Sequence, residues 1–105
     1  MSRQAIIVKT RTQAGKRSDV QAAYEEHLAP RASANPAQEI VVWMEDQMDP
    51  DVFYLFEIYE SAEAMEANAK APWFFEYLGA VGPLLAGEPE VTMGFPAWAK
   101  GIPAA

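Results

Sequence analysis

The chain has 105 residues, half of them hydrophobic, with 15 acidic and 8 basic side chains that give a formal net charge of −7. This acidic balance argues against nucleic acid or an anionic membrane as a partner, because both are bound through basic patches. The absence of cysteine excludes disulfides, thiolate metal sites and a cysteine nucleophile.

The length is that of one domain. The sequence therefore predicts a single domain over residues 1–105, with a core over about 5–95 and a C-terminal tail over 96–105. It contains no stretch typical of a signal peptide and no apolar run of membrane-spanning length. We therefore expect a cytoplasmic protein with no membrane partner.

The first half of the chain predicts two strands separated by a helix. Residues 5–12 are rich in β-branched side chains and then alternate with polar ones, which indicates a strand. Ser18, with a glutamine three residues later, is typical of a capping box. Apolar residues at helical spacing follow as far as Pro30, which should end or kink the helix. Residues 31–38 predict a loop, and residues 39–45 predict the second strand.

The second half of the chain predicts a third strand that forms a hairpin with the second, then two helices and a last strand. Residues 52–59 predict the third strand, and a helix capped by Ser61 is expected to run to about Lys70. Pro72 suits the first turn of another helix, and residues 90–95 predict the fourth strand. The resulting order, β-α-β-β-α-β, predicts an α+β ferredoxin-like fold with a four-stranded antiparallel sheet.

The predicted third strand is apolar on both of its faces. One face carries Phe53, Leu55 and Tyr59 around Glu57, and the other carries Tyr54, Phe56 and Ile58. A sheet covered on one face only would show apolar and polar residues in alternation. Because the helical segments suffice for one layer, we expect a second copy of the chain to cover the other face.

The residues of this strand and of the helices after it suggest a family. The segment F-Y-L-F-E-I-Y-E-S at 53–61, Ala64-Met65, and A-P-W-F at 71–74 together resemble the signature of the antibiotic-biosynthesis-monooxygenase family. Asn68 and Trp73 stand where that signature has histidines. The resemblance implies a homodimeric α/β barrel and, as in some relatives, oxidation of polycyclic phenols or quinols by O₂ without metal or flavin. The histidine and asparagine of haem-degrading relatives have no counterpart here.

Two residues are candidate catalytic groups. Asn68 can hold a substrate carbonyl or phenolate oxygen through its carboxamide, or it is a polar surface residue at a helix end. His27, the single histidine, lies on the apolar stripe of the first helix and can accept a phenolic proton. The alternative for His27 is a buried or half-buried helix histidine bonded to a carbonyl or carboxylate.

The aromatic residues are the candidate binding residues. A pocket for a flat ligand can be lined by five of them, with the alternative that they form core or dimer contacts: Trp73, Tyr77, Tyr54, Trp43 and Phe74. Glu57 is expected to have a structural role and to meet a base such as Arg11 or Lys9 across the sheet or the dimer, or a backbone amide, because an unpaired buried acid is costly.

Together these features predict a cofactor-independent monooxygenase that acts on an aromatic, phenol- or quinol-like small molecule. No phosphate-binding loop and no metal-ligand cluster are present in the sequence, and we expect neither a cofactor nor a metal. The alternative is a dimeric α/β-barrel protein that binds a hydrophobic small molecule without turnover or has a purely structural role.

Overall fold

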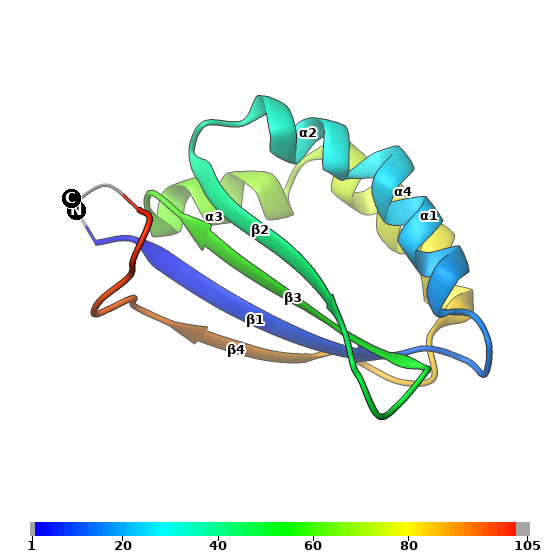
Figure 1. Ribbon diagram of the computed structural model, residues 1–105. Coiled ribbons are helices and arrows are strands. Elements are labelled where there is room, and N and C mark those ends of the chain that lie inside the picture. The colour runs from blue at the N-terminus through cyan, green and yellow to red at the C-terminus, as the bar shows by residue number, and fades with distance from the viewer. Residues whose placement is uncertain (1, 103–105) are drawn as a thin grey trace.

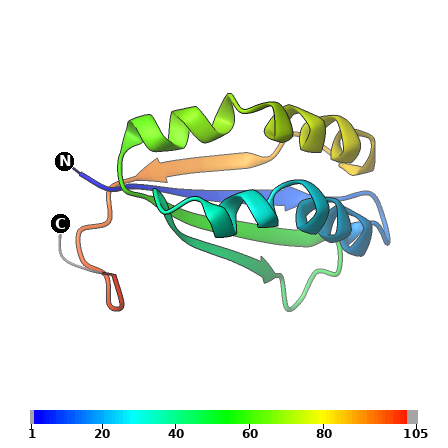
Figure 2. The ribbon, with the colours of Figure 1, turned by 90° about the horizontal axis from the view of Figure 1, so that it is seen from above.

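The computed structural model describes residues 2–102 and contains one sheet with helices on one of its faces (Figures 1 and 2). The elements in chain order are β1 (Gln4–Arg11), α1 (Arg17–His27), α2 (Ala29–Ala34), β2 (Gln38–Glu45), β3 (Val52–Tyr59), α3 (Ala62–Ala69), α4 (Pro72–Val81), the 3₁₀ turn η1 (Gly82–Leu84) and β4 (Glu90–Gly94). The four strands are antiparallel in the order β2-β3-β1-β4. This arrangement confirms the predicted ferredoxin-like fold.

The helices lie in two rows on the same face of the sheet, α1 with α2 and α3 with α4 (Figure 2). Their contact with the sheet rests on a core of buried side chains from α1, the residue that follows it, β3 and α4: Val20, Tyr24, Leu28, Phe53, Leu55, Tyr77 and Val81. Within this core Trp43 stacks on Phe53, with the ring centroids 3.9 Å apart and the planes 8° from parallel. No helix among residues 2–102 is both long enough and apolar enough to cross a membrane.

Strand β3 is central and has the two apolar faces that the sequence predicts. Antiparallel pairing places Leu55 between Val8 and Trp43, so all three face the helices. The same register turns Phe56 and Tyr54 to the outer face, which carries no helix. The helical layer therefore covers one apolar face and leaves the other open.

Two local predictions were wrong. Residues 31–38 are not all loop, because α2 occupies Ala29–Ala34 with Pro30 in its first turn, where proline costs no hydrogen bond. Ser18 does not cap α1, which begins one residue earlier and has no side-chain cap. By contrast, the cap at Ser61 is confirmed, since its hydroxyl oxygen accepts from the backbone N–H of Ala64 at 3.1 Å.

Arg17 ties the first helix to the β2–β3 hairpin. Its guanidinium donates to the backbone carbonyls of Asp49 and Val52 at 3.0 and 3.1 Å, and it lies 3.2 Å from the carboxylate of Glu45. Inside the turn, the Asp46 carboxylate accepts backbone hydrogen bonds from residues 48 and 49, which hold its pKa below the ordinary value. The acidic turn is therefore an ordered part of the fold.

Candidate functional site

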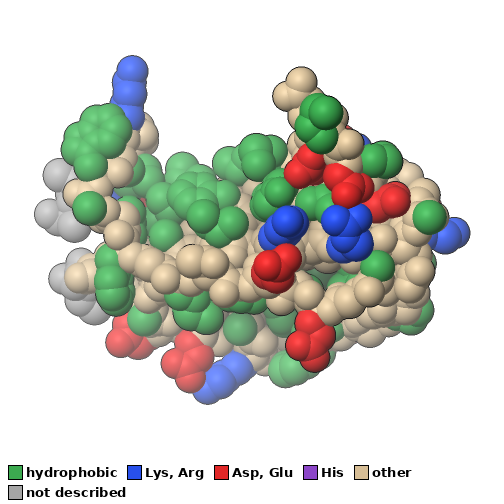
Figure 3. Space-filling model, turned by 90° about the horizontal axis from the view of Figure 1, so that it is seen from below, with side chains coloured by type: hydrophobic (Ala, Val, Ile, Leu, Met, Phe, Trp, Pro, Cys, Tyr) green, Lys and Arg blue, Asp and Glu red, His purple; other side chains and the backbone are tan. Residues whose placement is uncertain are grey.

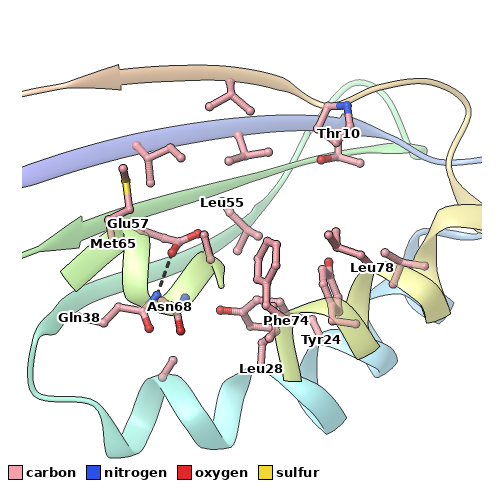
Figure 4. Close-up of a pocket in the computed structure, with 18 of the residues that line it drawn as sticks. Thr10, Tyr24, Leu28, Gln38, Leu55, Glu57, Met65, Asn68, Phe74 and Leu78 are labelled. Atoms are coloured by element: carbon pink, nitrogen blue, oxygen red, sulfur yellow. Dashed lines mark hydrogen bonds between the residues drawn. The ribbon is translucent and has the colours of Figure 1, made fainter. Parts of the chain in front are cut away.

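A mostly apolar cavity of about 240 Å³ lies between the helix-facing side of the sheet and the two rows of helices (Figure 4). Its apolar walls come from both layers and include Ile6, Val8, Leu28, Phe53, Leu55, Met65, Phe74, Leu78 and Val81. Its polar side chains are Thr10, Tyr24, Gln38, Glu57, Tyr59, Asn68 and Tyr77. Because ligand pockets are concave and apolar with a few polar groups, this cavity is the candidate site.

Glu57 is the only charged residue that lines the cavity within residues 2–102. Strand alternation turns its side chain toward the helices (Figure 4). One carboxylate oxygen, Oε1, accepts from Gln38 Nε2 at 2.8 Å and from the Tyr59 hydroxyl at 2.6 Å. In the part of the chain that the structure describes, Oε2 has no hydrogen-bond partner.

Within the sheet, the expected pairing of Glu57 with Arg11 or Lys9 was wrong. Lys9 is opposite Tyr54 in the sheet and so lies on the outer face, while Arg11 pairs with Asp49 at 2.8 Å. The charge of Glu57 is instead stabilised by neutral donors. The second carboxylate oxygen of Glu57 can therefore still accept a hydrogen bond from a further donor.

Asn68 joins this cluster through Tyr59. Its Nδ2 donates to the Tyr59 hydroxyl at 2.9 Å, and Gln38 Nε2 donates to the same oxygen at 3.0 Å. The Tyr59 hydroxyl therefore accepts two hydrogen bonds and donates its own proton to Glu57. Burial, together with the neighbouring charge of Glu57, raises the pKa of Tyr59, so this hydroxyl stays protonated at neutral pH.

Two further tyrosines present unused hydroxyls. Tyr24 and Tyr77 are buried residues that line the cavity, and neither hydroxyl has a hydrogen-bond partner among the described residues. Burial and then the charge of Glu57 raise the pKa of Tyr77 to about 12, and the same two causes raise the pKa of Tyr24. Both hydroxyls are therefore neutral donors near neutral pH.

Burial also raises the pKa of Glu57 above the ordinary 4.5, against the opposing effect of its hydrogen bonds from Tyr59 and Gln38. A carboxyl with a raised pKa in the folded state contributes most to stability below its unfolded pKa, and this contribution is lost as pH rises through the raised value. The charged form of Glu57 is therefore a cost to folding at neutral pH.

We expect Glu57→Gln to raise the free energy of unfolding at neutral pH. Glutamine keeps an acceptor for Tyr59 and Gln38 and removes the desolvated charge. The gain should be present at pH 7 and should shrink as the pH falls toward the ordinary pKa of 4.5, because the parent carboxyl then becomes protonated as well. Urea unfolding across this range measures it, with the exposed Glu60→Gln as the control. A Glu57→Gln protein less stable than the parent at pH 7 would contradict this reading.

Of the predicted site residues, the structure brings Asn68, Tyr77 and Phe74 to the cavity. The two predicted tryptophans do not line it. Trp43 stacks on Phe53, and the Trp73 ring lies 4.4 Å from the guanidinium carbon of Arg31. Both indole N–H groups are buried, and neither has a hydrogen-bond partner among residues 2–102.

Tyr54 and His27 lie elsewhere. Tyr54 is on the outer face of the sheet, and its hydroxyl donates to Asp46 Oδ2 at 3.0 Å. His27 is half-buried outside the cavity, with its ring nitrogens 3.6 Å from a Glu26 carboxylate oxygen and 3.9 Å from one of Glu76. The structure therefore does not bring either residue to Asn68.

Gln38, Tyr59 and Tyr24 were not predicted as site residues, and neither was a ligand-facing role for Glu57. The sequence signal that could have pointed to Glu57 was its position as an acid inside an apolar strand. For metal binding, residues 2–102 contain no group of three or more His, Asp or Glu side chains placed to share an ion.

The fold and cavity define a small α+β domain of ferredoxin-like architecture with an apolar cavity between its sheet and its helices. The family model described as antibiotic biosynthesis monooxygenase matches residues 3–77, and the chain belongs to this family. Among curated proteins, none matches the chain.

Several solved structures have a fold similar to that of this chain. A Chloroflexus aurantiacus protein provisionally named an antibiotic biosynthesis monooxygenase is 25% identical, with a TM-score of 0.83 over 97% of this chain and 100% of that one. Rv0793 from Mycobacterium tuberculosis is also 25% identical, with a TM-score of 0.82 over 94% and 99% of the two chains. A Nitrosomonas europaea protein with the same provisional name is 15% identical, with a TM-score of 0.86 over 95% of each chain, and shows the fold alone.

Proposed function

We propose that the protein is a cofactor-independent monooxygenase that acts on a phenol- or quinol-like small molecule in this cavity. The observation that carries the proposal is an apolar cavity that holds a hydrogen-bonded cluster of Glu57, Gln38, Tyr59 and Asn68. Membership of the family supports the reaction class. The apolar walls suit an aromatic ring, and the cluster suits a ring-bound oxygen.

The chemistry of such substrates needs no separate reductant. Oxidation of a phenol to a quinone by O₂ removes the hydroxyl hydrogen and one ring hydrogen, inserts one oxygen atom and releases the other as water. The ring supplies the electrons, and it does so more readily as the phenolate. A site that binds the developing phenolate oxygen therefore lowers the barrier. Asn68 has a second amide N–H and a carboxamide oxygen that are not bonded to Tyr59.

Removal of the Asn68 carboxamide tests this role. We expect Asn68→Ala to lower O₂ consumption by about 10²-fold, which is typical for the loss of one donor to a developing oxyanion. Consumption is measured with an oxygen electrode against a panel of phenols and quinols, after subtraction of the rate without protein. Lys70→Ala, an exposed change beside the same helix, should leave the rate unchanged.

Failure of the proposal has a clear signature. Consumption that stays at the protein-free rate with every compound, or that is equal in the parent and Asn68→Ala, would contradict it. Product formed at the same rate without O₂ would also contradict it.

Non-catalytic binding is the second candidate. No histidine is among the residues that line the cavity within the described chain, and histidine is the most frequent general base in enzymes. Under this alternative, native mass spectrometry finds a bound small molecule that stays unchanged in air. A cavity that binds nothing would leave a structural dimer.

We further propose that the protein is a homodimer through the outer face of the sheet. Hydrophobic side chains gather over the middle of this face, with charged side chains toward one end (Figure 3). Its exposed apolar residues include Ile7, Val42, Met44 and Phe56. Phe95 and Trp98, in the segment after β4, extend this surface and are also exposed. An apolar surface of this kind on a small domain is typical of an interface between proteins.

A further inference from the structure

The cavity has hydrogen-bonding groups of two kinds. Glu57 Oε2 is an acceptor with no partner, and the hydroxyls of Tyr24 and Tyr77 are donors with no partner, all within residues 2–102. No lysine, arginine or histidine is among the lining residues in this part of the chain. We infer that the cavity selects an uncharged ring whose hydroxyl donates to Glu57 and whose other polar edge accepts from Tyr24 or Tyr77, and that it rejects carboxylates of the same shape.

The carboxylate of Glu57 is held ready for this contact. Gln38 Nε2 and the Tyr59 hydroxyl both bind Oε1, and Tyr59 is itself held by Asn68. β3 is an inner strand of the sheet, paired on both sides. The orientation of the carboxylate is therefore fixed before a ligand arrives, and little side-chain entropy is lost on binding.

Charge decides what the cavity excludes. A carboxylate ligand would lie beside the carboxylate of Glu57 in an apolar space, with no cationic side chain among the lining residues of 2–102 to offset the repulsion. A hydroxyl has the opposite effect, because a hydrogen bond to a charged acceptor is stronger than one between two neutral groups. Two ligands of equal size therefore differ in affinity according to charge alone.

The same contact gives Glu57 a chemical role, which rests on the proposed function. When a bound phenol ionises, its proton moves along the hydrogen bond to Glu57 Oε2, which leaves a phenolate and a neutral carboxylic acid. No electron moves in this step, and no other reactant takes part. The negative charge is then on the ligand oxygen, where the second amide N–H of Asn68 can donate to it.

Anaerobic equilibrium dialysis with 1-naphthol, 1-methoxynaphthalene and 1-naphthoate tests the inference without turnover. We expect the parent protein to bind 1-naphthol at least tenfold more tightly than either of the others. In Glu57→Gln the affinity for 1-naphthol should fall by about tenfold or more. The affinity for 1-naphthoate should rise, because the new amide donates where a carboxylate repelled.

A gain of 1-naphthoate binding cannot come from a damaged fold, so it separates recognition from misfolding. Glu60→Gln, an exposed acid next to the end of β3, is the matched control and should bind all three probes as the parent does. The tyrosines are tested with 1-tetralone, which only accepts hydrogen bonds. Its affinity should fall in Tyr24→Phe/Tyr77→Phe and not in Glu57→Gln.

Equal affinity of the parent for 1-naphthol and 1-naphthoate would overturn the inference, as would an unchanged ratio in Glu57→Gln. This outcome is distinct from failure of the proposed function. Selective binding of 1-naphthol without O₂ consumption by any phenol would remove the monooxygenase proposal and the proton transfer, and leave the charge selection standing.

Discussion

Phe56→Asp is expected to convert the protein from a dimer of twice its 11.6 kDa chain mass into a monomer. The sheet register places Phe56 on the outer face directly between Ile7 and Val42. These three side chains are 36%, 44% and 47% exposed in the single chain. A charge in the middle of a buried apolar contact removes the burial and must itself be desolvated. Loss of a central aromatic residue costs an interface about 2–4 kcal/mol, which raises the dimer Kd by about 30- to 1,000-fold.

The folded monomer should tolerate this change, since the aspartate stays in water on the open face. Sedimentation equilibrium over a range of micromolar concentrations measures the mass, and circular dichroism checks the fold. Phe75→Asp is the matched control, because Phe75 is 60% exposed on α4, on the helical side of the sheet. A parent protein that is monomeric at these concentrations would contradict the proposed dimer. A Phe56→Asp protein as dimeric as the Phe75→Asp control would contradict the proposed interface.

The strands and their facing were predictable because they follow from side-chain alternation. The bounds of β3, Val52–Tyr59, match the prediction, and its two apolar faces are turned as the period of two requires. The short helix α2 was not predictable in the same way. Its sequence, A-P-R-A-S-A, has no apolar stripe, and none of its residues is buried. Its helical state depends on the chain continuing from α1 through Leu28, which accepts the backbone hydrogen bond of Ala32 at 2.9 Å.

The candidate site was only partly predictable, because the sequence alone does not show which residues of different strands are paired. Asn68 could be singled out because it is a polar residue within a matched local motif. Tyr59 lies two residues from Glu57 on the same face of β3, so alternation alone places these two side chains side by side. Gln38 could not be singled out, because it lies 19 residues away and meets Glu57 only once β2 and β3 are paired. The expected pairing of Glu57 with Lys9 was wrong because the two side chains lie on opposite faces of the sheet. Lys9 is opposite Tyr54, so its side chain leaves the sheet on the other face.

The same register explains why the site costs stability. A carboxylate among apolar walls is expensive unless it is bound, and here it is bound through one oxygen only. Its raised pKa and its open oxygen therefore have one origin, which is the incomplete hydrogen bonding of a carboxylate in an apolar cavity. The proposed ligand would supply the missing donor.

Phe53→Ala should cause the largest loss of stability of the changes considered. The Phe53 side chain is 1% exposed and stacks on Trp43, and it forms part of the cavity wall. Truncation of a buried phenylalanine costs about 3–5 kcal/mol through lost burial and an unfilled space. The free energy of unfolding of a whole domain is only about 5–15 kcal/mol. The variant should therefore unfold at a clearly lower denaturant concentration than the parent.

Urea unfolding at one fixed protein concentration measures this loss, because the proposed dimerisation would make the midpoint depend on concentration. Phe53→Leu is the matched control and should lose much less stability, since it keeps most of the apolar volume and loses mainly the ring contact with Trp43.

A loss of stability below about 1 kcal/mol in Phe53→Ala would mean that the walls of the cavity collapse into the space left by the ring. The cavity would then shrink with them, and the same variant would fail to bind 1-naphthol. A large loss of stability with 1-naphthol binding retained in the folded fraction would instead show that the wall is rigid and that Phe53 supports the cavity without defining its ligand.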